Sequence, residues 1–268
     1  MSEPLRLLAI FPHPDDETLG CGPALARYAA EGVEVYLVTA TRGQMGWTGP
    51  AEQNPGTETL GKIRETELQC AVQKLGLYRV HLLDYMDGEL DQVDRPEIVG
   101  MITSYIRGIR PQVVLTYAQE GVYGHPDHIA LAQITTAALV TAVDGSYTDL
   151  QNLPPHRVLK YYASVDSCSA VQAFRELAGP VSMMINGVER SHAGWEEWAI
   201  TTRFDTRPYF DRVEEAIHCH QSQFTGFGNL MNLSVDTRRS LFTEATFVRN
   251  YSLVNTSVNE TDLFEGIR

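Results

Sequence analysis

The sequence lacks clustered positive charge, paired cysteine motifs and long apolar runs. Its 21 Lys and Arg residues are outnumbered by 34 Asp and Glu residues, which gives a formal net charge of −13. Nucleic acids and anionic membrane surfaces attract proteins through clustered basic side chains, and no basic run is present. The composition therefore argues against a nucleic-acid or membrane-surface partner.

The cysteines are few and widely separated: Cys21, Cys70, Cys168 and Cys219. Without a CxxC pair, in a chain of this length, we expect buried free thiols in a reducing compartment, not a disulfide. The first apolar run, Leu5–Phe11, is interrupted by Arg6 and is too short for a signal peptide or a membrane span. We therefore predict a cytoplasmic protein with no membrane span.

Apolar runs alternate with helical patterns along most of the chain. The expected strands are Leu5–Phe11, Val33–Thr41, Val80–Leu83, Val113–Thr116, Tyr161–Val165 and Thr201–Phe204. The expected helices are Thr18–Ala30, Glu58–Leu75, Arg95–Ile109, Pro126–Val143 and Pro208–Gln223. This alternation predicts an α/β fold with a doubly wound, mostly parallel sheet flanked by helices. We expect one domain over residues 1–225, with a weakly patterned C-terminal extension, residues 226–268, packed on it.

The most informative segment is His13-Pro14-Asp15-Asp16-Glu17, where an apolar strand gives way to a helix. One imidazole and three carboxylates fall within five residues. Asp15 or Asp16 could simply cap the following helix, because acidic side chains suit helix N-termini. Taken alone, the motif leaves capping and metal binding about equally open.

A second cluster, His125-Pro126-Asp127-His128, lies at the same kind of strand-to-helix junction. His125 and His128 are three residues apart at a helix start, so they share a face. In open parallel sheets the loops after the strands meet at one edge, where the two clusters would converge. Two imidazoles and a carboxylate leave one position open for water, which is typical of a catalytic zinc site.

Other polar residues fall at the same edge of the predicted sheet. Gln44 follows the second strand and Asp87 follows the third. Arg64 lies on the apolar stripe of its helix, so it needs a polar partner there. His220 lies on the inward stripe of the helix predicted over 208–223, and a buried core histidine is the alternative for it.

These motifs resemble those of the PIG-L/LmbE-like deacetylases, a family of zinc-dependent N-deacetylases. The resemblance rests on the two His-containing clusters, with Tyr123-Gly124 before the second, and on Thr41-Arg42-Gly43, Arg64-x-x-Glu67, Asp87 and His220-x-Ser222-Gln223. It spans roughly residues 5–225 and implies a Rossmann-like, metal-dependent deacetylase domain. Family members often form hexamers, so a homo-oligomer is expected.

The resemblance also implies roles for the residues of the two clusters. The metal ligands would be His13, Asp16 and His128, holding Zn²⁺, and the same ligand types also accept Fe²⁺ or another divalent metal. Asp15 would be the general base. These assignments place the general base next to the metal that activates the water.

In the second cluster, the resemblance implies that His125 supports the oxyanion and is oriented by Asp127, while Tyr123 contacts the reacting carbonyl. Four further residues are expected to hold the substrate: Arg64, Asp87, Gln44 and His220. Gln44 stands where glucosamine-type members commonly carry Glu, so the sugar contact there is expected to differ.

We therefore expect removal of an N-acetyl group from an N-acetylglucosamine-type glycan or conjugate, a small-molecule amino-sugar substrate. One alternative is a related metal enzyme, an amide hydrolase or hydratase, that acts on another small polar substrate, because fold and metal do not fix the substrate. A non-catalytic metal-binding or sugar-binding module is the third hypothesis. It leaves Asp15 without a role, since binding alone needs no base.

Overall fold

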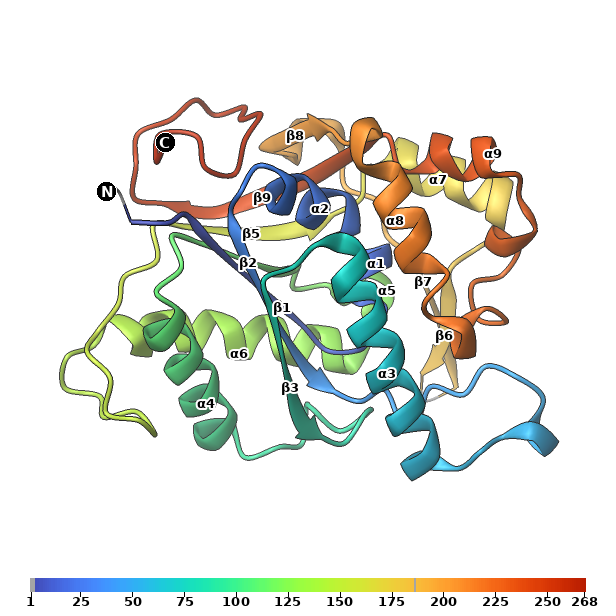
Figure 1. The fold of residues 1–268 in the computed structure, drawn as a ribbon, viewed down its shortest axis with the longest axis horizontal. Coiled ribbons are helices and arrows are strands. Elements are labelled where there is room, and N and C mark those ends of the chain that lie inside the picture. The colour runs from blue at the N-terminus through green and yellow to red at the C-terminus, as the bar shows by residue number, and fades with distance from the viewer. Residues whose placement is uncertain (1–2, 186) are drawn as a thin grey trace.

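A computed structural model describes residues 3–185 and 187–268, and its centre is a mixed seven-stranded sheet with the order β3-β2-β1-β4-β5-β9-β8 (Figure 1). The strands of this sheet are β1 (Arg6–Phe11), β2 (Glu34–Thr41), β3 (Arg79–Tyr85), β4 (Val113–Tyr117), β5 (Lys160–Val165), β8 (Thr202–Asp205) and β9 (Glu244–Ser252). The first five strands pair in parallel, and β9 runs antiparallel to both of its neighbours. The predicted mostly parallel α/β sheet is confirmed.

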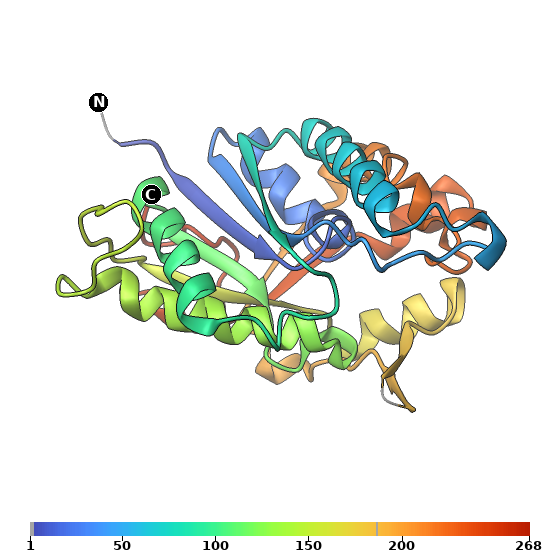
Figure 2. The same ribbon diagram turned by 90° about the horizontal axis from the view of Figure 1, so that it is seen from below.

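Helices cover both faces of the sheet. The longer ones are α2 (Gly22–Ala30), α3 (Thr57–Leu75), α4 (Arg95–Ile109), α6 (Pro126–Val143), α7 (Cys168–Ala178), α8 (Phe210–Ile217) and α9 (Val235–Leu241). Seen from below, α4 and α6 lie on one side of the sheet, and α3 and α8 lie on the other (Figure 2). Side chains of β1 alternate between the two apolar cores, with Leu7 in one and Leu8 in the other. The sheet is therefore buried on both faces, as parallel sheets are.

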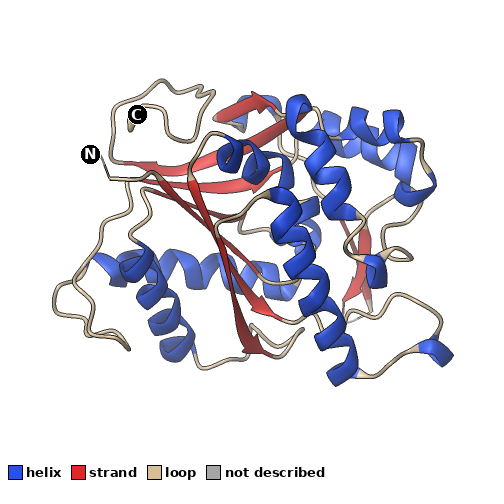
Figure 3. Cartoon of the chain, viewed as in Figure 1, coloured by secondary structure: helices blue, strands red, loops and turns tan. Residues whose placement is uncertain are grey.

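Smaller elements complete the fold. They are α1 (Asp16–Leu19), α5 (Gly121–Gly124), the hairpin strands β6 (Ser182–Ile185) and β7 (Val188–Ser191), and the short 3₁₀ turns η1 (Ala51–Gln53), η2 (Glu197–Ala199), η3 (Arg207–Tyr209), η4 (Gln221–Gln223) and η5 (Leu230–Asn232). The β6–β7 hairpin lies apart from the main sheet (Figure 3). Within the described part of the chain, the helices are too short or too polar for a transmembrane segment.

Local sequence explains the two helices whose bounds match the prediction. The side chain of Asp94 accepts a hydrogen bond from the Glu97 N–H at 3.1 Å, which caps α4. Pro126 opens α6 at the first helical position, where proline costs no hydrogen bond. These signals lie within a few residues of the start of each helix, so the sequence alone reveals where each helix begins.

The C-terminal segment contributes β9, the strand between β5 and β8. Beyond it, Glu260 lies fully buried and pairs with Lys160 at 2.6 Å and with Arg249 at 2.7 Å. The hydroxyl of Tyr162 donates to the same carboxylate at 2.6 Å. This polar network fastens the end of the chain to the middle of the sheet.

The structure corrects two of the predicted helices. The helix expected over 208–223 ends at Ile217, and a 3₁₀ turn, η4, follows after a break at His220. The helix expected over 18–30 is divided into α1 and α2 at Gly20 and Cys21. Apolar spacing continues across both breaks, so periodicity alone does not reveal them.

The prediction of four free thiols was wrong. Cys70 of α3 and Cys219, just beyond α8, form a disulfide across 149 residues of sequence. Cys21 is a buried free thiol, and Cys168 is free but exposed. The pairing depends on how α3 packs against α8, which sequence spacing does not show.

Candidate metal centre

The topology brings the two histidine clusters together. The first follows β1 and the second follows β4, and these strands are parallel neighbours in the sheet, with Leu7 opposite Val113. Loops that leave the carboxyl ends of neighbouring parallel strands emerge side by side. The clusters, 112 residues apart in sequence, therefore lie close together in the fold, as predicted.

Three side chains that follow these two strands form a group that can hold a metal ion. One ligand atom from each of His13, Asp16 and His128 lies within 4.8 Å of the others. The His13 Nδ1 is 3.4 Å from one Asp16 oxygen, and the His128 Nε2 is 3.6 Å from the other. All three side chains are buried. Two nitrogens and an oxygen are suitable ligands for a catalytic zinc ion.

His128 gives the clearest sign that this group fits a metal. Within the described residues, neither of its buried ring nitrogens has a hydrogen-bond partner. Its ring stacks on Tyr117, with centroids 4.7 Å apart and an interplanar angle of 4°. Burial lowers the pKa of His128 to about 3, so the imidazole is neutral, the form that binds metals. A cation at Nε2 would satisfy an atom that is otherwise costly to bury.

His13 is oriented by two carboxylates. Its Nε2 lies 3.0 Å from Asp87 and 3.1 Å from Asp127, so this nitrogen donates and Nδ1 is left to face Asp16. The Asp127 carboxylate is itself fixed by the backbone N–H groups of Gly88 at 2.7 Å and Leu90 at 3.0 Å. A carboxylate that orients a histidine in this way is a common companion of metal ligands.

A second group of potential ligands, His13, His125 and Asp127, also lies within 4.8 Å. Both oxygens of Asp127 already accept backbone hydrogen bonds, however. The group with His128 is the better fit because, within the described residues, the two ring nitrogens of His128 have no competing partner.

Asp15 lies beside the metal group and is not a member of it. Its Oδ2 accepts a hydrogen bond from Arg64 at 3.1 Å. Burial raises the pKa of Asp15 to about 6, although the Arg64 charge opposes the shift. Asp15 stands at the N-cap position of α1, but its side chain makes no capping hydrogen bond. The capping interpretation therefore does not explain this carboxylate.

Arg64 is buried and braces two loops. It donates to the Gly43 carbonyl at 2.8 Å, to the Pro14 carbonyl and to Asp15. The predicted polar partner of this arginine therefore exists. The guanidinium makes these hydrogen bonds to the protein itself, so Arg64 supports the position of Asp15.

His125 and Asp127 meet differently from the prediction. The Nδ1 of His125 accepts from the backbone N–H of Asp127 at 3.1 Å, while the Asp127 carboxylate contacts His13. Burial lowers the pKa of His125, which favours a neutral ring with its proton on Nε2. The ring of Tyr123 lies 5.8 Å from that of His125 and 5.6 Å from that of His128. Tyr123 and His125 thus border the metal group.

The structure gives the predicted substrate residues internal partners. Asp87 accepts from His13 and from the Met45 N–H at 3.0 Å. Gln44 accepts from the Arg42 N–H at 3.0 Å and donates to the Tyr85 carbonyl at 3.1 Å. These contacts connect the loops after β2 and β3 at the edge of the site.

His220 has no exposed surface, so it is placed beneath the site and not against a substrate. Its Nε2 lies 2.8 Å from the Glu17 carboxylate and 3.2 Å from the Thr18 hydroxyl. The core-histidine alternative matches this placement.

Sequence reasoning missed Tyr117, the last residue of β4. Besides stacking on His128, it donates a hydrogen bond to Asp16 at 3.0 Å. Its place at the end of a buried strand, next to the second cluster, was the available signal. Glu17 was noticed only as part of the motif.

Comparison with known proteins agrees with this geometry. Residues 8–139 match the family model described as PIG-L, GlcNAc-PI de-N-acetylase. The chain is 32% identical to a 1D-myo-inositol 2-acetamido-2-deoxy-alpha-D-glucopyranoside deacetylase of Streptomyces avermitilis, over 98% of this chain and 97% of that protein. It is 29% identical to a mycothiol S-conjugate amidase of Streptomyces coelicolor, over 100% of this chain and 99% of that protein.

The fold is also similar to that of the N,N'-diacetylchitobiose deacetylase from Pyrococcus horikoshii. The TM-score is 0.67 at 21% sequence identity, over 91% of this chain and 83% of that chain. The two-cluster motif, the metal group built from it and the near full-length similarity to named deacetylases agree. This chain belongs to the PIG-L family of deacetylases.

Proposed function

We propose that this protein is a zinc-dependent hydrolase that removes the N-acetyl group from an N-acetylglucosamine-type glycan or conjugate. The observation that supports the proposal is a group of three side chains that can hold a metal ion, His13, Asp16 and His128, with an additional carboxylate, Asp15, beside it. A binding site needs the first three residues only. The fourth gives the arrangement a base.

A divalent cation held by these ligands would supply a Lewis acid that polarises the amide carbonyl and makes water more acidic. Zn²⁺ suits the ligand set, and Fe²⁺ or another divalent metal is the alternative. Asp15 takes the proton of the attacking water and later delivers it to the departing amine nitrogen. A carboxyl with a pKa of about 6 is suited to both tasks near neutral pH.

His125 is proposed to stabilise the oxyanion. With Nδ1 occupied by the Asp127 N–H, the Nε2–H can donate to the carbonyl oxygen as negative charge develops there. Losing one donor of this kind typically costs about 10²–10³ in rate. Tyr123 borders the same space and is proposed to contact the carbonyl.

The test is to load the protein with zinc, incubate it with a panel of N-acetylated amino sugars and conjugates, and measure acetate and primary amine. The wild type should release both in equal amounts. Asp15→Asn should keep the metal and lose about 10²–10⁴ in kcat, the usual contribution of a positioned base. Absence of release from every amino sugar would contradict the proposal.

A second candidate is hydrolysis of a different amide. The specific observation is that Arg64, Asp87 and Gln44, expected to hold a sugar, are engaged in internal hydrogen bonds. Adding N-acyl amino acids and thiol conjugates to the panel, together with amide-free substrates for hydration, tests this candidate in the same assay. Release confined to amides without a sugar would favour it.

Two expectations stay predictions. Members of the family often form hexamers, so we expect a homo-oligomer. Sedimentation of the purified protein would measure the mass of the assembly. The cytoplasmic location is the other expectation. The disulfide does not favour it, because disulfides are rare in strongly reducing compartments.

A further inference from the structure

The backbone of Asp15 has a conformation that a non-glycine residue rarely adopts. Its φ is 101° and its ψ is −26°, in the left-handed region. Its carbonyl accepts the first hydrogen bonds of α1, from Thr18 at 3.0 Å and Leu19 at 2.8 Å. Such a conformation persists only when surrounding contacts hold it, and such residues gather at functional sites.

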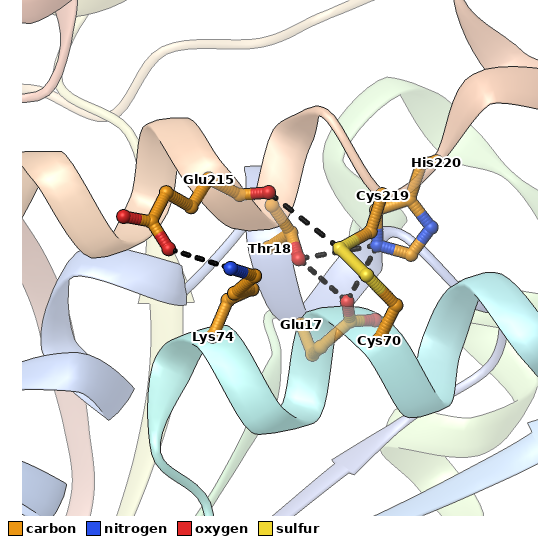
Figure 4. The surroundings of a disulfide bond; sticks show 7 residues. All are labelled: Glu17, Thr18, Cys70, Lys74, Glu215, Cys219 and His220. Atoms are coloured by element: carbon orange, nitrogen blue, oxygen red, sulfur yellow. Dashed lines mark hydrogen bonds and ion pairs between the residues drawn. A yellow bond between two sulfur atoms is a disulfide. The ribbon is translucent and has the colours of Figure 1, made fainter.

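Glu17 supplies a contact that holds the backbone N–H of Asp15. This side chain is fully buried, and its Oε2 accepts the backbone N–H of Asp15 at 2.9 Å. The other oxygen, Oε1, accepts from the Thr18 hydroxyl at 2.6 Å and lies 2.8 Å from the His220 Nε2 (Figure 4). Because both of its oxygens have partners, the Glu17 carboxylate is held in one orientation.

The support of Glu17 is in turn fixed to α3. His220 follows Cys219, which is joined to Cys70 of α3 by the disulfide (Figure 4). Two residues further on, Ser222 donates through its N–H and its hydroxyl to the Glu67 carboxylate, both at 2.7 Å. The turn that presents His220 is therefore attached to α3 by a covalent bond and by two hydrogen bonds.

We propose that Glu17 is a positioning residue: by accepting the Asp15 N–H, it fixes the backbone that directs the Asp15 carboxylate beside the metal group. This inference rests on the proposed function, in which Asp15 is the base. It assigns Glu17 no contact with substrate or metal. Its effect reaches the reaction only through Asp15.

The experiment compares two near-isosteric variants with a matched control. Glu17→Met removes the acceptor, and Glu17→Gln keeps an amide oxygen for the Asp15 N–H. Thr18→Val removes a hydrogen bond to the same carboxylate but leaves the Asp15 contact intact. Each metal-loaded variant is assayed for kcat, KM and bound metal, alone and in an Asp15→Asn background.

We expect Glu17→Met to lower kcat by about 10²-fold, the usual cost of misplacing a reacting group by about 1 Å. KM should change less than about threefold and bound metal should stay the same, because Glu17 contacts neither substrate nor metal and their binding is unaffected. Glu17→Gln should lose less than Glu17→Met, and Thr18→Val less than either. In the Asp15→Asn background Glu17→Met should cause no further loss, because residues that act through one group are not additive.

Three results would overturn the inference: unchanged kcat in Glu17→Met, loss of metal from it, or an equal further loss on top of Asp15→Asn. If Glu17→Met does not fold, a crystal structure of active Glu17→Gln decides, and an Asp15 with negative φ overturns it. If the wild type releases acetate from no substrate, the proposed function fails separately. Positioning is then judged from crystals, which should show a displaced Asp15 in Glu17→Met.

Discussion

Replacing Cys70 and Cys219 by serine should lower the free energy of unfolding by about 2–4 kcal/mol, the usual contribution of a native disulfide. The bond joins residues 149 apart in sequence, so it restricts a long loop in the unfolded chain. The chain-entropy relation for a loop of this length gives a ceiling of about 5 kcal/mol at 25 °C. We expect less than the ceiling because denatured chains retain some structure.

The assay is equilibrium unfolding in urea, followed by circular dichroism in the presence of a chelator so that metal binding does not contribute. Cys168→Ser is the matched control, because Cys168 is free and exposed and should change stability by less than about 0.5 kcal/mol. Wild-type protein in dithiothreitol should behave like the double variant. The reasoning is refuted if the double variant is as stable as the control, or if unfolded, unreduced protein titrates with four thiols.

Three further predictions concern the site and the C-terminal segment. His128→Ala should lose both metal, measured by mass spectrometry of the bound ion, and activity; retained metal would refute the ligand assignment. Arg64→Met should move the acid limb of the kcat/KM profile to higher pH, because the Arg64 charge lowers the pKa of Asp15 and its loss raises that pKa; an unmoved limb would refute the link. Glu260→Gln should cost about 3–5 kcal/mol in thermal unfolding, because Lys160 is left as an unpaired buried charge. The Glu260 pKa is lowered despite its burial, through Lys160, so this stability should be present above the ordinary carboxyl pKa and lost as the pH falls further.

The sequence predicts elements well where the determining contacts are local. The first residues of α4 and α6 follow from a capping aspartate and from prolines in the first turn. The end of α8 does not, because its apolar stripe continues past Ile217. There His220 turns inward to meet Glu17, a residue 203 positions away in sequence. Long-range contacts of this kind override local pattern.

For the site, the sequence predicts which residues gather but not how they pair. The rule that loops meet at the carboxyl edge of a parallel sheet correctly brought His13 and His128 together. The same rule does not decide which side chain the Asp127 carboxylate contacts. In the structure this carboxylate contacts His13 and not His125. Differences of a few ångströms choose between such partners, and only packing determines them.

Two different parts of the fold hold the proposed metal ligands and orient the proposed base. The proposed metal ligands, His13, Asp16 and His128, follow β1 and β4, with Asp16 in the first turn of α1 and His128 in the first turn of α6. The orientation of Asp15 depends on α3, through Arg64 directly and through the disulfide behind His220. A change that shifts α3 should therefore weaken proton transfer while leaving metal binding intact. A change at β1 or β4 should remove both, because proton transfer has no function without the metal beside it.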